Sequence, residues 1–148
     1  MIKFALMGCG KIAKRHAFLL GNSLINGAKL VAVCDLDLNR AKELINEFEN
    51  INAYDDLDKM MTSEDVDVLV ILTPSGMHAR HTIEASKYKA HIVVEKPMAL
   101  TLKDADQMIN VCKNNDISSP NLPFKLKMFS VLLFFKTSLL SYTSKCNF

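Results

Sequence analysis

A short glycine-rich turn near the N-terminus is the feature that most constrains how this chain can fold. Gly8-Cys9-Gly10 follows the apolar run 2–7, which has the length and character of a buried strand. Gly8 can adopt backbone angles that a larger residue cannot, and Gly10 lets a pyrophosphate approach the backbone closely. A helix that begins near Gly10 would point free N–H groups and its positive dipole end at such a phosphate. The pattern is typical of a dinucleotide-binding turn; an ordinary strand–turn–helix without a ligand is the alternative.

The helix after the turn carries small residues where it would meet the strand. Ala13 occupies the third small position of the motif, where a larger side chain would hold the helix away. Ile12, His16 and Leu20 recur at helical spacing beside it. The candidate cofactor-binding residues of this turn are Gly8, Cys9, Gly10, Lys11 and Ile12.

A second apolar run ends in an acidic residue. Residues 30–34 have the pattern of a strand, and Asp35 follows them. A dinucleotide site places a carboxylate there to accept hydrogen bonds from the adenosine ribose, usually about 20 residues after the glycines. The loop 21–27 explains the longer separation in this chain. The same carboxylate would repel a 2′-phosphate, so NAD is favoured over NADP.

Two neighbouring residues leave alternatives open for Asp35. It could instead cap the expected helix 38–48, a position for which Asp37 competes. Arg40 lies close enough to stack on adenine or to pair with a phosphate, which complicates the preference for NAD.

Composition restricts the class of protein. The chain has 148 residues, enough for one domain with its own core, and a charge mix typical of soluble globular proteins. A net charge of +2 gives no electrostatic reason to expect a nucleic-acid partner. The four cysteines are far apart and lack metal-ligand spacing, so no metal site is predicted. Cys9 and Cys34 are expected to be small buried hydrophobes, and no signal-peptide pattern opens the chain, which indicates a reducing, cytoplasmic setting.

Strands and helices alternate through residues 1–116. This order predicts an α/β fold with a doubly wound, Rossmann-like parallel sheet, in a single domain with an atypical C-terminal tail. Thr101 ahead of Asp104 is a plausible helix start. The expected strands are 2–7, 29–34, 51–54, 66–72 and 90–94, and the expected helices are 11–21, 38–48, 56–61, 76–88 and 101–114.

Residues 117–148 differ from the rest of the chain. They contain no acidic residue and five of the eight phenylalanines. The apolar run 126–135 is too short for a membrane anchor, which needs about 20 apolar residues, and Lys136 interrupts it. A replacement edge strand is a second interpretation. The third interpretation, which we favour, is a tail that is not native to the fold, as after a shift of reading frame. The hydrophobic periodicity and the balance of acidic and basic residues both depart from those of a folded domain in this segment.

A second motif follows the later strands. Thr73-Pro74 comes after the strand 66–72, and Glu95-Lys96-Pro97 comes after the strand 90–94. Because ligands of open parallel sheets bind beyond the carboxyl ends of the strands, these residues should share one edge with the glycine turn. Pro97 restricts Lys96 to extended backbone and is compatible with a cis bond. A lysine there could hydrogen-bond a substrate hydroxyl and ease its deprotonation; a surface lysine paired with Glu95 is the alternative.

The combined motifs resemble the N-terminal domain of the Gfo/Idh/MocA family, NAD(P)-dependent oxidoreductases that act mostly on sugars, sugar nucleotides and cyclitols. The resemblance covers residues 1–116. It implies an NAD-dependent oxidoreductase of this type, represented by its cofactor-binding domain and truncated; a catalytically inactive dinucleotide-binding module is the alternative. The matching stretches are Gly8 to Ala13, Cys34-Asp35, Thr73-Pro74 with His78, and Glu95-Lys96-Pro97.

The resemblance also implies roles for individual residues. The lysine matching Lys96 contacts substrate and nicotinamide, and the acid matching Asp35 binds the adenosine ribose. The segment 72–74 lines the nicotinamide ribose, with His78 nearby. Lys96 is therefore the candidate catalytic residue. The candidate cofactor-binding residues are Gly8, Cys9, Gly10, Lys11, Ile12, Asp35, Arg40, Leu72, Thr73, Pro74, His78 and Glu95.

The departure from the family concerns its second half. The family continues with a sixth strand and a C-terminal α/β domain, which supplies an Asp and a His for proton transfer and usually builds the oligomer. Residues 117–148 stand in its place, so this chain alone is expected to bind NAD weakly, to turn over nothing and to be able to self-associate through exposed apolar surface. His81 is expected to face solvent or cap a helix turn, and His91 to start a strand.

Overall fold

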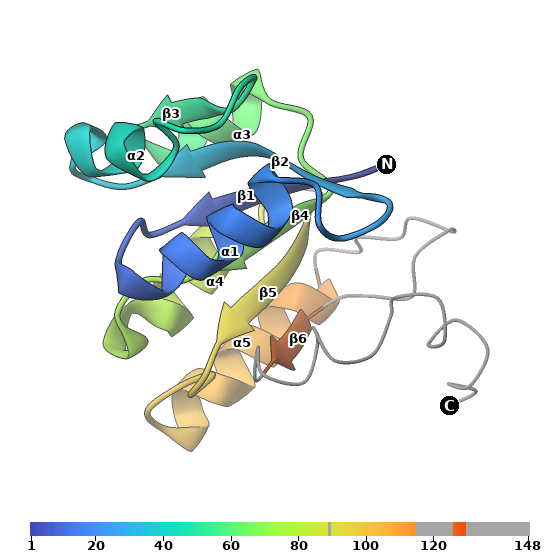
Figure 1. Cartoon of the computed structure of the whole chain (residues 1–148). Coiled ribbons are helices and arrows are strands. Elements are labelled where there is room, and N and C mark those ends of the chain that lie inside the picture. Colours follow the sequence, from blue (N-terminus) through green and yellow to red (C-terminus); the bar gives the residue numbers. More distant parts are fainter. Residues whose placement is uncertain (89, 115–125, 130–148) are drawn as a thin grey trace.

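A computed structural model describes residues 1–88, 90–114 and 126–129 of the chain. It contains one parallel sheet with the strand order β3-β2-β1-β4-β5-β6 and helices on both faces, which confirms the doubly wound α/β fold (Figure 1). The strands are β1 (Ile2–Met7), β2 (Ala28–Cys34), β3 (Asn52–Tyr54), β4 (Val68–Ile71), β5 (His91–Glu95) and β6 (Leu126–Phe129). The helices are α1 (Lys11–Gly21), α2 (Leu38–Leu44), α3 (Leu57–Ser63), α4 (His78–Ala85) and α5 (Leu102–Asn114), with a 3-10 turn, η1 (Ser75–Met77), before α4.

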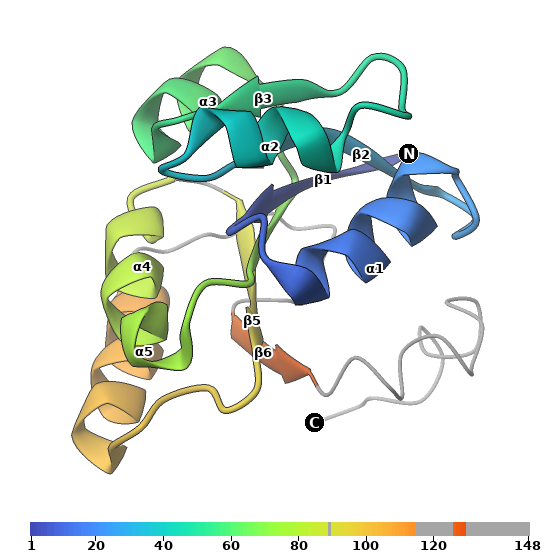
Figure 2. The ribbon, with the colours of Figure 1, turned by 60° about the vertical axis from the view of Figure 1, so that its left-hand side comes forward.

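The sheet separates two apolar clusters. Helices α1 and α2 cover one face, and α3, α4 and α5 cover the other (Figure 2). Successive residues of β1 point to opposite faces, so Leu6 joins the first cluster and Ala5 the second. All of β4 is buried, which explains its uninterrupted apolar sequence.

The order of the strands reverses at β1. This strand pairs with β2 on one side and with β4 on the other, both in parallel. The crevice beyond the carboxyl ends of β1 and β4 is therefore the topological switch point, where open α/β sheets bind their ligands.

Two expected helices are shorter than their sequence patterns. The helix expected over 38–48 ends at Leu44, because the chain turns there and brings Phe48 back onto α1. A Cβ at Gly21 would lie 2.8 Å from Phe48 Cδ1, so the ring packs directly on the Gly21 backbone. The helix expected over 76–88 is divided into η1 and α4, and it ends at Ala85.

Two smaller expectations are confirmed. Asp104 N donates to Thr101 Oγ1 at 3.1 Å, so Thr101 caps the start of α5. His91 is the first residue of β5.

The four residues of β6 pair in parallel with β5, so the structure assigns an edge strand to this part of the tail. The other residues of the tail, and the domain boundary expected at 116, lie outside the described residues.

Candidate cofactor site

The carboxyl ends of four strands bring the predicted site residues to one edge of the sheet. Gly8 follows β1, Asp35 follows β2, Thr73 lies just beyond β4, and Lys96 follows β5. These strands are neighbours in the order β2-β1-β4-β5 and all run in the same direction (Figure 1). The structure thus gathers residues that are far apart in sequence around the switch point.

Gly8 is required by the fold itself. Its φ of +96° lies in a region that side chains rarely adopt, and its N–H donates to the carbonyl of Cys34 at 2.8 Å. A Cβ at this position would lie 2.9 Å from Leu72 C and 2.9 Å from Thr73 N. Only glycine therefore lets the turn after β1 pass so close to the end of β4.

Gly10 differs from Gly8, because a Cβ here would have no atom within 4 Å. It is the N-cap of α1, where no side chain caps the helix and no acidic residue occupies the first turn. Within the described part of the chain, no acceptor faces the N–H groups of Gly10, Lys11 and Ile12. Open space in front of free N–H groups at a positive helix end fits a pyrophosphate.

Asp35 is held in place by the turn that it faces. Its Oδ2 accepts from Cys9 N at 2.8 Å, and its Oδ1 accepts from Asp37 N at 3.0 Å. Asp37, and not Asp35, caps α2, since Asp37 Oδ1 accepts from Asn39 N at 3.0 Å. The capping alternative for Asp35 is therefore excluded. Its carboxylate has lone pairs left to accept from the hydroxyl groups of a ribose.

The neighbours of Asp35 add two features. Arg40 Nη1 lies 3.7 Å from Asp35 Oδ1, but the Arg40 side chain is 57 % exposed, so the pair contributes little to stability. Leu36 is 88 % exposed and offers an apolar surface beside the carboxylate. Sequence reasoning missed Leu36. The available signal was an apolar residue between two acids just beyond a strand.

The segment after β4 is held by two histidines of α4. His78 Nε2 lies 2.8 Å from the Thr73 carbonyl oxygen, and His81 Nδ1 lies 2.8 Å from Thr73 Oγ1. The expectation that His81 faces solvent or caps a helix turn is wrong. His81 is only 5 % exposed, because α4 turns this residue inward onto the Thr73 hydroxyl.

The Glu95-Lys96-Pro97 turn follows β5 and contains a cis Lys96–Pro97 bond. Glu95 is buried, and its Oε2 accepts from Lys96 N at 2.7 Å. Lys96 itself is exposed, and in the described residues no carboxylate pairs with its ammonium group. Glu95 thus fixes the backbone of Lys96 and leaves the side chain free.

Burial sets the electrostatics of the groups behind this edge. Cys9 and Cys34 are buried, as predicted, and burial raises the pKa of both thiols to about 12, which disfavours their thiolate forms. Burial also lowers the pKa of His16, whose Nε2 lies 3.9 Å from Glu95 Oε1, and the pKa of His81, where Arg80 adds to the effect.

These shifts predict that acid destabilises the fold. The folded pKa of His16 and of His81 lies below the unfolded value, so their stabilising contribution is complete above about pH 6.5 and falls as the pH drops. Each group should contribute up to about 1.4 kcal/mol per pH unit to this loss. Urea unfolding between pH 7.5 and pH 5 (roughly the range in which histidine titrates) measures it. The variant His16→Asn should weaken the dependence of the free energy of unfolding on pH. A free energy of unfolding that rises toward pH 5 would contradict the prediction.

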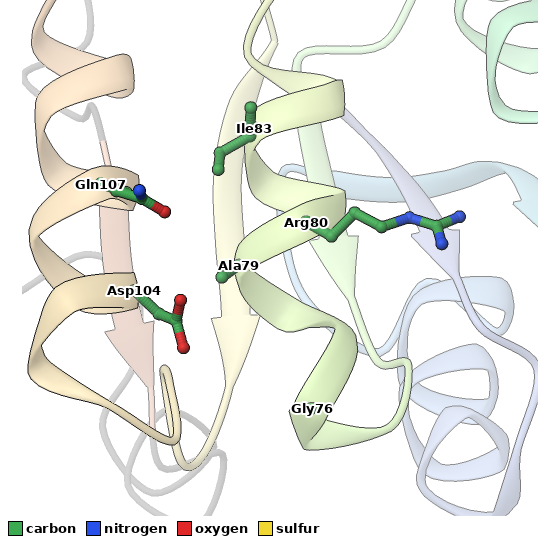
Figure 3. A pocket seen from close by; sticks show the side chains of 6 residues that line it. All are labelled: Gly76, Ala79, Arg80, Ile83, Asp104 and Gln107. Carbon is green, nitrogen blue, oxygen red and sulfur yellow. The ribbon is translucent and has the colours of Figure 1, made fainter.

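A separate depression lies between α4 and α5 and has a volume of about 320 Å³. Asp104 and Gln107 project from α5 toward α4, whereas Arg80 extends away from α5 (Figure 3). None of the candidate cofactor residues lines this depression, so it is distinct from the site at the sheet edge. Its lining residues are Gly76, Ala79, Arg80, Ile83, Asp104 and Gln107.

The described ranges contain no group of three or more His, Cys, Asp or Glu side chains that could hold a metal ion. Within the same ranges, no helix has the length and apolar character needed to cross a membrane.

A parallel sheet with a glycine turn at its switch point and a carboxylate after the second strand defines a dinucleotide-binding Rossmann domain. The model of the oxidoreductase family with the NAD-binding Rossmann fold matches residues 2–118. The chain therefore belongs to this family, the Gfo/Idh/MocA family, and the resemblance predicted from its motifs is confirmed.

Relatives of known activity match the same part of the chain. D-glucoside 3-dehydrogenase of Escherichia coli K12 is 32 % identical over 113 residues, which cover 76 % of this chain and 32 % of that enzyme. The scyllo-inositol 2-dehydrogenase (NADP(+)) of Bacillus subtilis 168 is 30 % identical over 117 residues, 79 % of this chain and 35 % of the relative. The chain thus spans about a third of the length of the curated relatives that it matches.

A solved structure shows the same fold. The WlbA dehydrogenase of Chromobacterium violaceum, in complex with NADH and UDP-GlcNAcA, superposes with a TM-score of 0.74 at 30 % identity. The match covers 86 % of this chain and 34 % of that structure.

Proposed function

We propose that residues 1–116 form the NAD-binding domain of a dehydrogenase that acts on a sugar, sugar nucleotide or cyclitol. One observation carries the proposal. The unpaired N–H groups at the start of α1 and the positioned carboxylate of Asp35 lie at the switch point of the sheet. The first group fits a pyrophosphate and the second fits a ribose diol, which are the two recognition features of a dinucleotide.

The residues of the site divide between the two halves of NAD. The adenosine half would lie against Asp35 and Leu36, and the pyrophosphate against Gly10, Lys11 and Ile12. The nicotinamide half would then extend over the ends of β4 and β5, toward Leu72, Thr73, Pro74 and Glu95. NAD is preferred to NADP, since Asp35 would repel a 2′-phosphate. The guanidinium of Arg40, 3.7 Å from Asp35 Oδ1, would act in the opposite direction.

Lys96 is proposed as the catalytic residue. The chemistry that NAD supplies when bound is acceptance of a hydride from the carbon that bears the substrate hydroxyl. The ammonium group of Lys96, exposed at the end of β5, can donate a hydrogen bond to that hydroxyl and stabilise negative charge on its oxygen. A sugar-type substrate is consistent with the names of the relatives, a glucoside and an inositol dehydrogenase.

A second proposal concerns the 148 residues by themselves. In the family, the Asp and His for proton transfer belong to the second domain, and the chain matches only about a third of each relative. The isolated chain should therefore bind cofactor without turnover. Any oxidation of a sugar or inositol at an ordinary enzymatic rate, about 1 s⁻¹ or faster, would contradict this.

The setting of the protein is also a proposal. The three described cysteines are free and buried, which fits a reducing, cytoplasmic compartment. The net charge of +2 supports the absence of a nucleic-acid partner. Phe18 and Leu24 are each 58 % exposed and could mediate self-association.

Replacement of Asp35 tests the proposed function. The variant Asp35→Ala should weaken NADH binding by about tenfold or more, since hydrogen bonds to a charged group are lost. Titration of NADH fluorescence measures the affinity. Asp55→Ala is the matched control, because Asp55 follows the edge strand β3 and pairs with Lys59 at 3.1 Å, away from the glycine turn. Equal affinities for the two variants would overturn the proposal.

A further inference from the structure

His78 occupies an unusual position between two strand ends. The side chain is buried, with 1 % of the residue exposed. Its Nε2 lies 2.8 Å from the carbonyl oxygen of Thr73, just beyond β4, and its Nδ1 lies 2.8 Å from the carbonyl oxygen of Pro97, in the turn after β5. One imidazole ring therefore connects the two segments over which the nicotinamide half of the cofactor is proposed to lie.

The chemistry of the ring limits how both contacts can form. A carbonyl oxygen only accepts hydrogen bonds, so the ring donates through the nitrogen that carries the proton. Both ring nitrogens lie 2.8 Å from a carbonyl oxygen, so the ring fills the space between the two strand ends.

The same turn is held from its other side by Glu95. The carboxylate of Glu95 accepts from Lys96 N, and the His78 ring meets the carbonyl of Pro97, the next residue. The backbone on both sides of the Lys96–Pro97 bond is thus fixed by side chains, whereas the Lys96 side chain remains exposed.

We propose that His78 is a positioning residue that ties the end of β4 to the Lys96–Pro97 turn and so directs Lys96 toward the substrate. This role rests on the proposed function, because it gives Lys96 its task. His78 itself is too buried to contact a substrate, so it acts through the two carbonyl groups that it holds.

The contact with the turn can be read without any cofactor. NMR of the full chain should show through-space contacts between the His78 ring and Pro97. The absence of these contacts would overturn the proposal, whether or not the chain binds NAD.

The positioning role is tested by replacement. Asparagine in His78→Asn is shorter and cannot bridge both carbonyls, so the Lys96 amide resonance should shift and NADH affinity should fall by about tenfold, as expected for the loss of a buried hydrogen-bonded contact. The affinity for ADP-ribose, which lacks nicotinamide, should not change. The matched control is His81→Asn, which removes a contact to Thr73 Oγ1 but none to the turn, and should leave the Lys96 resonance in place.

The outcomes separate this proposal from the proposed function. If the wild-type chain binds neither NADH nor ADP-ribose, the proposed function fails, and the NMR results still decide whether His78 holds the turn. If the wild-type chain binds both and His78→Asn changes neither the Lys96 resonance nor NADH affinity, the positioning role is wrong.

Discussion

Replacement of Gly8 by alanine is expected to destabilise the fold by about 3 kcal/mol or more, enough to unfold a domain of marginal stability. Two costs combine at this position. The φ of +96° disfavours any side chain, and the new Cβ would lie 2.9 Å from the backbone atoms Leu72 C and Thr73 N, which cannot move without shifting the end of β4. Urea unfolding followed by circular dichroism measures the loss.

Gly27 offers the matched control for this prediction. Its φ is +80°, but a Cβ there would have no atom within 4 Å. Gly27→Ala therefore has only the backbone cost, about 1–2 kcal/mol. The difference between the two variants isolates the close approach of the turn to β4. Equal losses would show that this approach is not tight in solution.

The second large effect is expected at Gly10, on binding. Gly10→Val should reduce NADH affinity by about 100-fold or more, because the side chain would fill the space in front of the N–H groups of α1 and exclude the pyrophosphate. The fold itself should tolerate the change, since Gly10 has a φ of −77° and open space around its Cβ position. Unfolding without ligand should therefore differ from wild type by about 1 kcal/mol at most.

This pair of properties makes the experiment decisive. If a stable Gly10→Val chain binds NADH as well as wild type does, the pyrophosphate does not bind in front of Gly10. A variant that fails to fold would contradict the open geometry of Gly10, and Gly10→Ala then gives a smaller test of the same space.

Much of the fold could be predicted because its signals are local. The apolar runs of β1 and β4 and the capping residues of α5 are visible within a few residues of sequence. The end of α2 could not be predicted in this way, because it depends on Phe48 packing against Gly21, a contact between distant segments. A helix pattern that continues past Leu44 cannot report such a contact.

The site shows the same division. The glycine turn, Asp35 and the Glu95-Lys96-Pro97 turn were predicted to share one edge, and the parallel strands place them there. The prediction that His81 faces solvent or caps a helix turn was wrong, because the structure turns this side chain inward. A histidine is compatible with either face of a helix, and its surroundings decide whether it finds a buried partner such as Thr73 Oγ1.

The sequence by itself determined the family, the order of the motifs and the sheet edge at which they meet, because strand direction and glycine turns follow from short-range pattern and stereochemistry. Only the tertiary structure decided what each polar group bonds to. It assigned the cap of α2 to Asp37, leaving Asp35 to face the turn, and it set His78 between the carbonyls of Thr73 and Pro97. Hydrogen bonds need partners within about 3 Å and in line, and packing of distant segments alone supplies that geometry.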